Sequence, residues 1–444
     1  MLIKKIFITL ILVLTSCVNS KISSQKTFIN IEKNIDKSLY NGAEIFLVED
    51  NSLPIISFNL KFKNISTSYD PKDKEGLAHL TSMLMLEDAG IYTSNEIKKK
   101  FEQMGTIISF EQDLDNIYLK ITCLKLKAKE TFELINILFN QPKLKQEAID
   151  IAKDKLINIV NYRNSDPSSI ADNEWMKIIF NHHSYSKEAN ISKNTINSIT
   201  RKNIEQFIKN NFSYSNLTIY IVGDINKDKA YDLFNLLNLP KNNVKLEDGE
   251  NSALFKAIRT QYIIDKKFPQ ASIVFGQKWD FNKNDYYKAK ILNYILGGRG
   301  LQSRLMQSLR EEKGLTYGVH TNIEKYNLAN IWQGNVAVNN KNVFEAINLI
   351  KEEIKQLKLS SISQIELDNA KTNLINTFIL KLDKNSNIAN ILTSANLEES
   401  NTDFFKTRTE NISKITLNEI NDFANTVLDD TKVIFSIVGD KDLM

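Results

Sequence analysis

The sequence is poor in the residues that most often build metal centres and disulfide frameworks. Its 444 residues include only two cysteines and four histidines. Two cysteines cannot form a disulfide scaffold or a cysteine-rich zinc module, and four histidines limit the number of histidine metal sites. The sequence also lacks an excess of either charge, because 57 Lys and Arg oppose 53 Asp and Glu. This balance argues against a dedicated nucleic-acid binder.

An apolar run near the N-terminus is too short to cross a membrane. Ile6–Leu14 follows Lys4 and Lys5, and nine helical residues rise only about 14 Å. Residues 1–16 are therefore predicted to be a signal peptide. The run leads into Leu14-Thr15-Ser16-Cys17, which resembles a bacterial lipobox. The alternative is an ordinary secretory signal followed by an incidental cysteine.

The lipobox resemblance implies that Cys17 is diacylated and becomes the new N-terminus. Val18 follows it, which favours the periplasmic face of the outer membrane in a bacterium with two membranes. The polar residues 17–36 are then a tether to the lipid anchor. The second cysteine, Cys123, lies in the alternating, strand-like run Ile117–Leu124. It is predicted to be a buried structural thiol.

The sequence carries an internal repeat of roughly 210 residues. A helix-like segment from Ser198 to Phe207 leads to Ile221-Val222-Gly223-Asp224, and a matching segment from Lys414 to Phe423 leads to Ile437-Val438-Gly439-Asp440. The two copies keep one separation, from Thr200 to Thr416 and from Ile221 to Ile437. The strand-like starts also correspond, with Pro54 matching Pro269. These matches indicate a duplicated domain.

The repeat and the intervening polar segment predict the domain organisation. Residues 37–239 form the first domain, residues 240–256 a linker with Pro240 and polar neighbours, and residues 257–444 the second domain. Strand pairs and long helical stretches alternate irregularly within each half. This pattern predicts an α+β fold of two tandem homologous domains, each a mostly antiparallel sheet with helices on one face.

A segment after the first strand predicts a helix with one buried face, because Leu77, Leu80 and Leu84 recur at helical spacing. It reads Glu75-Gly76-Leu77-Ala78-His79-Leu80-Thr81-Ser82-Met83. The segment resembles the zinc-binding helix of the insulinase/pitrilysin peptidases, the inverzincins, whose pattern is Gly-x-Ala-His continuing as H-x-x-E-H. There, two histidines four residues apart bind zinc, and the glutamate activates zinc-bound water. The resemblance implies a clamshell arrangement of the two domains.

The zinc-binding pattern is degenerate in this chain. His79 remains, but Ser82 stands at the general-base position and Met83 at the second ligand position. A hydroxyl is no base at neutral pH, and a thioether is a poor zinc ligand. The family's third ligand is a downstream glutamate, and the corresponding Lys155–Val160 contains no carboxylate. The resemblance therefore implies no catalytic residue and no metal in this chain.

Two other arrangements for a metal remain open. One is an improvised site of His79 and Glu75, and the other uses the adjacent His182 and His183. The segment around that pair, Phe180–Tyr185, resembles a His-Pro-Tyr stretch that the family uses structurally.

The second half carries a more specific signature. Leu296–Leu305 is rich in glycine and ends in Ser-Arg-Leu, and Leu309–Val319 contains Arg-x-x-x-Gly-Leu-x-Tyr. Its glycines permit a tight turn into a helix that Gly314 ends, and Tyr317 is expected to enter a strand. The family resemblance implies that Arg310 and Tyr317 face the peptidase cleft and bind the substrate backbone. The alternative is that Arg310 pairs with a neighbouring glutamate and that Tyr317 is a core residue.

The retained signature and the lost ligands together imply a division of labour. The chain resembles the inactive subunit of two-subunit family members, similar to those of the mitochondrial processing peptidase. It is predicted to pair with a zinc-bearing sister chain, so that zinc belongs to the partner and both chains enclose an extended peptide. One alternative is a non-catalytic peptide-binding or structural envelope lipoprotein. A third is a standalone zinc metalloendopeptidase.

Overall fold

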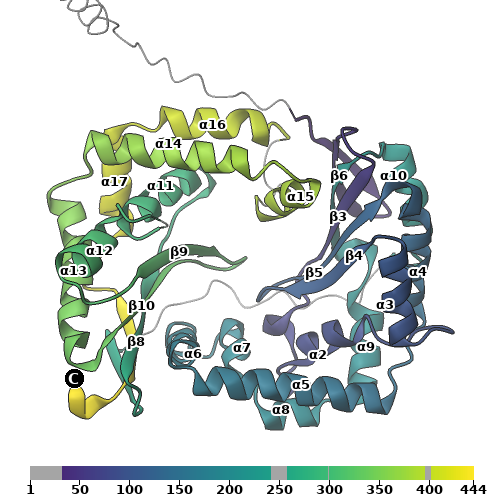
Figure 1. Ribbon diagram of the computed structural model, residues 1–444, viewed down its shortest axis with the longest axis horizontal. Coiled ribbons are helices and arrows are strands. Elements are labelled where there is room, and N and C mark those ends of the chain that lie inside the picture. Colours follow the sequence, from purple (N-terminus) through teal and green to yellow (C-terminus); the bar gives the residue numbers. More distant parts are fainter. Residues whose placement is uncertain (1–32, 242–257, 299, 396–401) are drawn as a thin grey trace, which may run out of the picture. The chain divides into compact units, whose positions relative to one another are not determined.

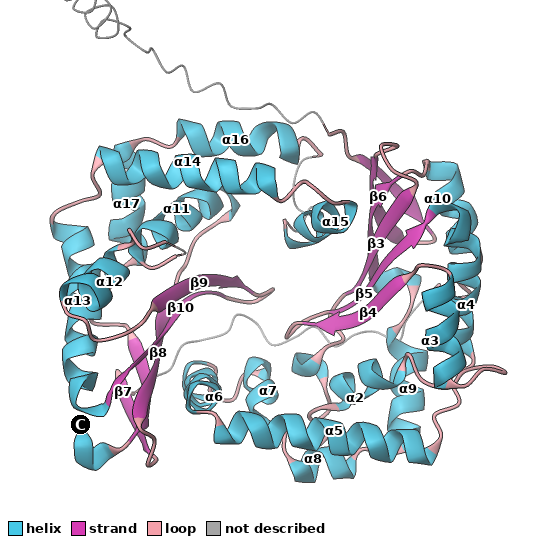
Figure 2. Ribbon diagram, in the orientation of Figure 1, coloured by secondary structure: helices cyan, strands magenta, loops and turns pink. Residues whose placement is uncertain are grey.

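Two β-sheets, one in each half of the chain, organise the protein (Figures 1 and 2). The computed structural model describes residues 33–241, 258–298, 300–395 and 402–444. The first sheet contains β1 (Asp36–Tyr40), β2 (Ala43–Glu49), β3 (Ile55–Phe62), β4 (Ile107–Gln112), β5 (Ile117–Leu124) and β6 (Leu217–Gly223). The second contains β7 (Gln261–Asp265), β8 (Gln270–Lys278), β9 (Val319–Lys325), β10 (Asn330–Asn339) and β11 (Ile434–Gly439).

The two sheets have the same topology, which confirms the duplication. The strand order β2-β6-β3-β5-β4 of the first sheet repeats as β7-β11-β8-β10-β9 in the second, and β1 is an additional edge strand. In each sheet one pair is parallel, β2 with β6 and β7 with β11, and the other pairs are antiparallel. The register repeats as well, because Phe58 lies opposite Ile221 and Ile273 lies opposite Ile437.

Helices make up most of the remaining described structure. Those before the linker are α2 (Leu77–Leu84), α3 (Ser94–Gln103), α4 (Ala128–Asn140), α5 (Gln146–Ser165), α6 (Pro167–Ile179), α7 (Lys187–Asn190), α8 (Lys193–Ser198), α9 (Arg201–Asn211) and α10 (Lys227–Asn235). Those after it are α11 (Tyr286–Leu296), α12 (Arg304–Met306), α13 (Val343–Leu359), α14 (Gln364–Leu380), α15 (Asn385–Ser394), α16 (Phe404–Lys414) and α17 (Leu417–Val427). None of the described helices combines the length and apolar composition that crossing a bilayer requires.

The repeated segments begin their helices in the same way. Thr200 caps α9 and Thr416 caps α17, each through a hydroxyl that accepts a hydrogen bond from the backbone N–H three residues later. In return, the N–H groups of Thr200 and Thr416 donate to the side-chain oxygens of Asn203 and Glu419. This reciprocal capping satisfies donors that the first helical turn leaves unpaired. It explains why the short repeat is preserved at these positions.

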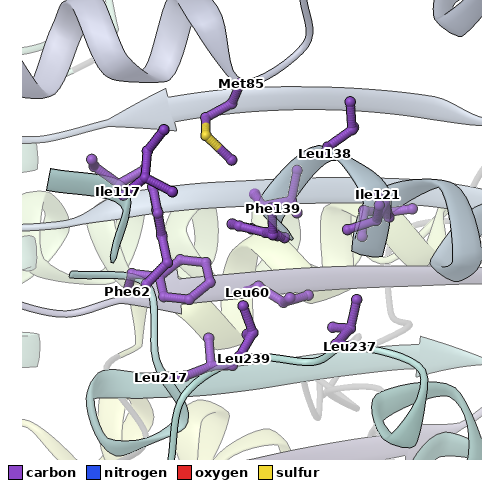
Figure 3. Packing of buried hydrophobic residues seen from close by; sticks show 14 of the residues in the cluster. Leu60, Phe62, Met85, Ile117, Ile121, Leu138, Phe139, Leu217, Leu237 and Leu239 are labelled. Carbon is purple, nitrogen blue, oxygen red and sulfur yellow. The ribbon is translucent and has the colours of Figure 1, made fainter. Parts of the chain in front are cut away.

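The core of the first half lies between one face of its sheet and the helices that cover it (Figure 3). Phe62 on β3 packs edge-to-face against Phe212, and Phe139 on α4 contacts both rings. Cys123 lies in this core with an exposed fraction of 1%, and burial raises the pKa of its thiol to about 12. The prediction of a buried structural thiol is therefore correct.

Each half also places a helix on the other half's sheet. Helix α6 of the first half packs against β8 and β11, and α15 of the second half packs against β3 and β6 (Figure 1). Trp175 on α6 is fully buried there, and its indole Nε1 donates a hydrogen bond to the carbonyl of Ile434 at 3.0 Å. On the other sheet, the Asn59 side-chain amide donates to Asn390 and Thr393 of α15, each at 3.0 Å. The sequence predicted helices on one face only.

Several sequence-based predictions fall outside the described residues. These are the signal peptide, Cys17, the tether as far as residue 32 and most of the linker. The last residue predicted for the tether, Asp36, begins β1. The linker prediction begins at Pro240, and the described part of the first half ends at Lys241.

Candidate functional site

The degenerate zinc helix, α2, begins where a buried carboxylate meets a glycine turn. Gly76 has a φ of +102°, a conformation that a side chain disfavours. Its N–H and that of Ala78 donate to the carboxylate of Asp70 at 2.8 and 3.0 Å. Burial raises the pKa of Asp70 well above its usual range, although these hydrogen bonds and Lys187 act against that. Glycine is thus required at the start of α2 whether or not a metal binds.

His79 is held by an ion network instead of a metal. Its Nε2 lies 2.9 and 3.1 Å from the two carboxylate oxygens of Glu188 on α7. Glu188 also accepts a hydrogen bond from the guanidinium of Arg163, near the end of α5, at 2.7 Å. Burial alone would raise the pKa of Glu188, but His79 and Arg163 outweigh it and lower the pKa to about 2. The carboxylate of Glu188 therefore lies between His79 and the cationic guanidinium of Arg163.

The other positions of the zinc pattern have different surroundings. The Ser82 hydroxyl donates to the side-chain oxygen of Gln112 at 3.3 Å. Met83 is half-buried against the core of the first half. Leu156, within the segment that would carry the third ligand, is a buried residue of α5, which packs against α2. Each of these side chains therefore either packs in the core or makes a hydrogen bond between uncharged groups.

These residues do not fit a zinc ion. Zinc in proteins takes three or four ligands from imidazole, thiolate and carboxylate groups, and the zinc-pattern positions His79, Ser82 and Met83 offer one imidazole, one hydroxyl and one thioether. The carboxylate beside His79 is already neutralised by Arg163. In the described residues there is no group of three or more His, Cys, Asp or Glu that could hold a metal ion. The improvised site also fails, since the partner of His79 is Glu188 and not Glu75.

The adjacent histidines His182 and His183 form part of a turn. His183 is buried, and its Nδ1 accepts a hydrogen bond from the N–H of Tyr185 at 3.1 Å. The His183 ring packs edge-on against the Tyr185 ring, with centroids 4.7 Å apart. His182 is exposed and has a φ of +64°. The turn therefore shapes the segment before α7, which carries Glu188.

The ion network gives a testable pH dependence. The pKa of Glu188 is lowered in the folded state, so its stabilisation is present above the unfolded pKa of about 4.5 and is lost as the pH falls toward 2. Glu188→Gln is expected to reduce the free energy of unfolding at pH 7 by on the order of 2 to 3 kcal/mol. The difference between variant and wild type should shrink between pH 4.5 and 2, measured by urea denaturation across that range.

A surface glutamate provides the control for this prediction. Glu205 pairs with Arg201 one helical turn away, and both side chains are about half exposed. Glu205→Gln is expected to change the free energy of unfolding by less than about 0.5 kcal/mol at every pH. Equal effects of the two substitutions would show that the network contributes no more than an ordinary surface pair.

Arg310 and Tyr317 lie on the surface of the second half. Arg310 belongs to a π-helical turn, Gln307–Glu312, and its Nε lies 3.4 Å from the carboxylate of Glu311. Tyr317 has an exposed fraction of 91% and precedes β9 instead of entering it. The alternative of a core tyrosine is therefore wrong, and so is the expectation that Tyr317 enters a strand. The other alternative, an ion pair of Arg310 with a neighbouring glutamate, is present as the pair with Glu311, which is exposed to solvent.

A cleft lies where the two halves meet, with a volume of about 770 Å³. Residues of β4 and β5 line one side, and β9 and the loop after it line the other. Buried Asp115 joins the halves, because its carboxylate accepts hydrogen bonds from the N–H of Asn327 at 2.9 Å and from the hydroxyl of Tyr185 at 3.2 Å. Burial, above all, raises the pKa of Asp115 to about 6. Neither Arg310 nor Tyr317 lines this cleft.

Each half of the chain matches a protein-family model. Residues 64–190 match the model described as "Insulinase (Peptidase family M16)", and residues 198–374 match "Peptidase M16 inactive domain". The two matches cover well over half of the sequence. The chain belongs to the insulinase family of peptidases, M16. The first match includes His79 and Glu188, and the second includes Arg310 and Tyr317. With the zinc positions lost, the chain is a non-catalytic member of M16.

Individual proteins resemble the chain over most of its length. The "Non-peptidase homolog YmxG" of Helicobacter pylori is 24% identical over 88% of this chain and 91% of its own. An "Uncharacterized zinc protease" of Rickettsia felis is 21% identical over 79% of this chain and 84% of its own. The crystal structure of a "peptidase M16 inactive domain from Pseudomonas fluorescens" has a TM-score of 0.85 at 22% identity, covering 92% and 98% of the two chains. That structural match shows the shared fold.

Sequence reasoning missed two members of the ion network, Glu188 and Arg163. Arg163 follows Leu156 and Val160 at helical spacing on α5, so a helical projection would place it on the side that faces α2. Glu188 carries no such signal. It lies 109 residues from His79 in the sequence, and only the fold brings the two together.

Proposed function

We propose that this chain is the non-catalytic subunit of a zinc metallopeptidase and pairs with a zinc-bearing sister chain. Its part would be to help enclose an extended peptide and to hold the peptide backbone for hydrolysis. The partner's zinc would supply the activated water. The proposal rests on the loss of the zinc ligands around His79 while Arg310 and Tyr317 remain on an accessible surface.

The chemistry of the two retained residues suits this role. The guanidinium of Arg310 presents several donors in a fixed plane, and the phenol of Tyr317 adds one more. Both can donate to a peptide carbonyl or to the oxyanion that forms when water attacks it. The recorded partner of Arg310 is its own neighbour Glu311, at 41% and 48% side-chain exposure. Such an exposed pair costs little to break when a partner chain and peptide arrive.

The deciding experiment measures metal and activity on the same preparation. The chain from Ser20 to Met444 would be analysed for zinc and assayed with a quenched peptide, alone and mixed with the zinc-motif sister chain of the same genome. We expect no stoichiometric zinc, no cleavage alone, and more cleavage in the mixture than by the sister chain by itself. Stoichiometric zinc with cleavage by the single chain would instead establish the standalone peptidase.

A second candidate function is peptide binding or envelope structure without catalysis. The cleft of about 770 Å³ between the halves favours it, because several charged and amide side chains line a space that needs no metal to hold a peptide. Peptide binding by the single chain without activity in any mixture would support this candidate over the subunit proposal.

The cellular location belongs to the same proposal. The sequence of residues 1–17 supports export and lipid attachment at Cys17, with the protein held at the periplasmic face of the outer membrane. Metabolic labelling with a fatty acid tests this directly. We expect the label in the wild-type chain and none in Cys17→Ser.

A further inference from the structure

Three exposed leucines lie at one end of the first sheet. Leu53 lies in the turn before β3, Leu124 ends β5, and Leu126 follows two residues later, with exposed fractions of 57%, 43% and 89%. The strands hold them together, because Leu124 lies opposite Ile55 and the N–H of Lys125 donates to the carbonyl of Pro54 at 2.9 Å. We call Leu53, Leu124 and Leu126 the leucine tip.

The apolar surface continues beside the leucine tip. A groove of about 760 Å³ borders Leu126, and its apolar lining includes Ile56, Leu233 and Leu236. Exposed leucines occur singly on most proteins without consequence. Three together on backbone held by strand hydrogen bonds, next to an apolar groove, form the kind of patch that marks an interaction site.

The chain itself indicates what this patch faces. Lys33, where the described structure begins, pairs with Asp50 at 2.6 Å, and Asp50 lies in the same turn as Leu53. The described part of the chain therefore begins beside the leucine tip. Fifteen residues lie between Cys17 and Lys33, and the sixteen Cα–Cα steps that join them can span at most about 55 Å. A lipid on Cys17 would thus hold Lys33, beside the leucine tip, within about 55 Å of the bilayer.

The charges around the leucine tip favour an apolar contact over an electrostatic one. Lys125, Lys127 and Lys129 alternate with Leu126 and Ala128. Each of the three lysines pairs with a carboxylate, at 2.7, 2.8 and 3.8 Å respectively. The segment is therefore close to neutral, so a partner need not be anionic. Exposed leucines flanked by lysines whose charges are paired suit the interface of a phospholipid bilayer, where the leucines enter the apolar layer and the ion pairs stay in water.

We propose that the leucine tip docks into the surface of the bilayer to which Cys17 tethers the chain. Docking fixes the orientation of the protein on the membrane, which a tether alone does not. The inference goes beyond the subunit role and is independent of it. It rests on lipid attachment for its biological setting, but the docking itself can be tested with an artificial tether.

The test places a fluorescent reporter at the tip of a tethered chain. The chain from Ser20 retains the whole compact unit that begins at Lys33, and a histidine tag ahead of Ser20 binds nickel-chelating lipid in phosphatidylethanolamine/phosphatidylglycerol vesicles. Leu126→Cys provides the labelling site for an environment-sensitive dye, because Cys123 is buried. Leu359→Cys is the matched control, an exposed leucine of the second half with an exposed fraction of 69%.

We expect the dye at position 126 to shift to the blue on vesicles and the dye at position 359 to keep its emission in water. High salt and vesicles without anionic lipid should leave the shift in place. In the untagged chain, Leu126→Asp should lower partitioning onto vesicles by about tenfold, as expected for one lost leucine contact, and Leu359→Asp should not. Equal emission at both positions would overturn the proposal.

Other occupants of the patch give different results. If the leucine tip joins two copies of the chain, Leu126→Asp changes the molecular mass in solution and leaves vesicle partitioning unchanged, which also overturns the proposal. Because the tag replaces the acyl chains, failure of the Cys17 labelling experiment leaves this test valid. Failure of the peptidase mixture likewise has no bearing on it.

Discussion

Arg310→Ala is expected to lower kcat/KM of the paired peptidase by about 10²- to 10³-fold while leaving the complex assembled. Removing one donor that stabilises a developing oxyanion typically costs that much. Arg310 is exposed and pairs with the neighbouring Glu311, so the substitution removes a solvent-exposed ion pair that contributes little to the fold. The quenched-peptide assay measures the loss, and light scattering of the mixture confirms assembly.

Three further variants sharpen this result. Arg310→Lys keeps the charge but loses the planar set of donors, so it should recover only part of the activity. Tyr317→Phe removes one hydroxyl from a side chain with an exposed fraction of 91% and is expected to cost about tenfold or more. Lys313→Ala, an exposed change just after the same π-helical turn, should behave as wild type. Equal activity of Arg310→Ala and Lys313→Ala would remove Arg310 from the proposed mechanism.

Trp175→Ala is expected to reduce the free energy of unfolding by about 3 to 5 kcal/mol, the range for truncating a large buried aromatic side chain. The side chain is fully buried, and its Cζ2 lies so close to β8 that a Cβ on Gly276 would be 2.8 Å from it. The substitution leaves a cavity between α6 and the second sheet and removes the hydrogen bond to Ile434. Urea denaturation followed by circular dichroism measures the change.

This prediction separates the contact between the halves from ordinary core packing. Trp175→Phe keeps an aromatic ring but not the indole N–H, so its cost should be smaller, on the order of 1 to 2 kcal/mol. Lys177→Ala changes a half-exposed residue of the same helix and should have little effect. A Trp175→Ala protein as stable as Lys177→Ala would mean that α6 contributes little to holding the two halves together.

The duplication and the degenerate site were readable in the sequence because both are local patterns. Repeated strands and caps keep their spacing, so Thr200 and Thr416 mark the same helix start in each half. Zinc ligands at positions i and i+4 must share one helix face, so their replacement around His79 shows without a structure. The family resemblance rests on these same short segments.

The second-half signature predicts less of the local structure. Its glycine turn and the helix that Gly314 ends were anticipated, with Gly314 at a φ of +61°. The π-helical form of Gln307–Glu312 and the exposed position of Tyr317 outside β9 were not. Backbone hydrogen-bond patterns of this kind depend on the surrounding packing, and no residue type specifies them.

The sequence by itself determined that the protein is a duplicated α+β chain whose zinc helix keeps His79 but has lost the general base and the second ligand. Repeat spacing is enough for the first conclusion, and side-chain chemistry along one segment is enough for the second. Only the tertiary structure decided what replaced the metal, how the halves are joined and where exposed residues gather. His79, Glu188 and Arg163 meet through three separate helices, and Trp175 reaches the opposite sheet. Contacts between distant segments have no period in the sequence. They follow from the packing of elements that each bury an apolar face, and that packing is a property of the whole fold.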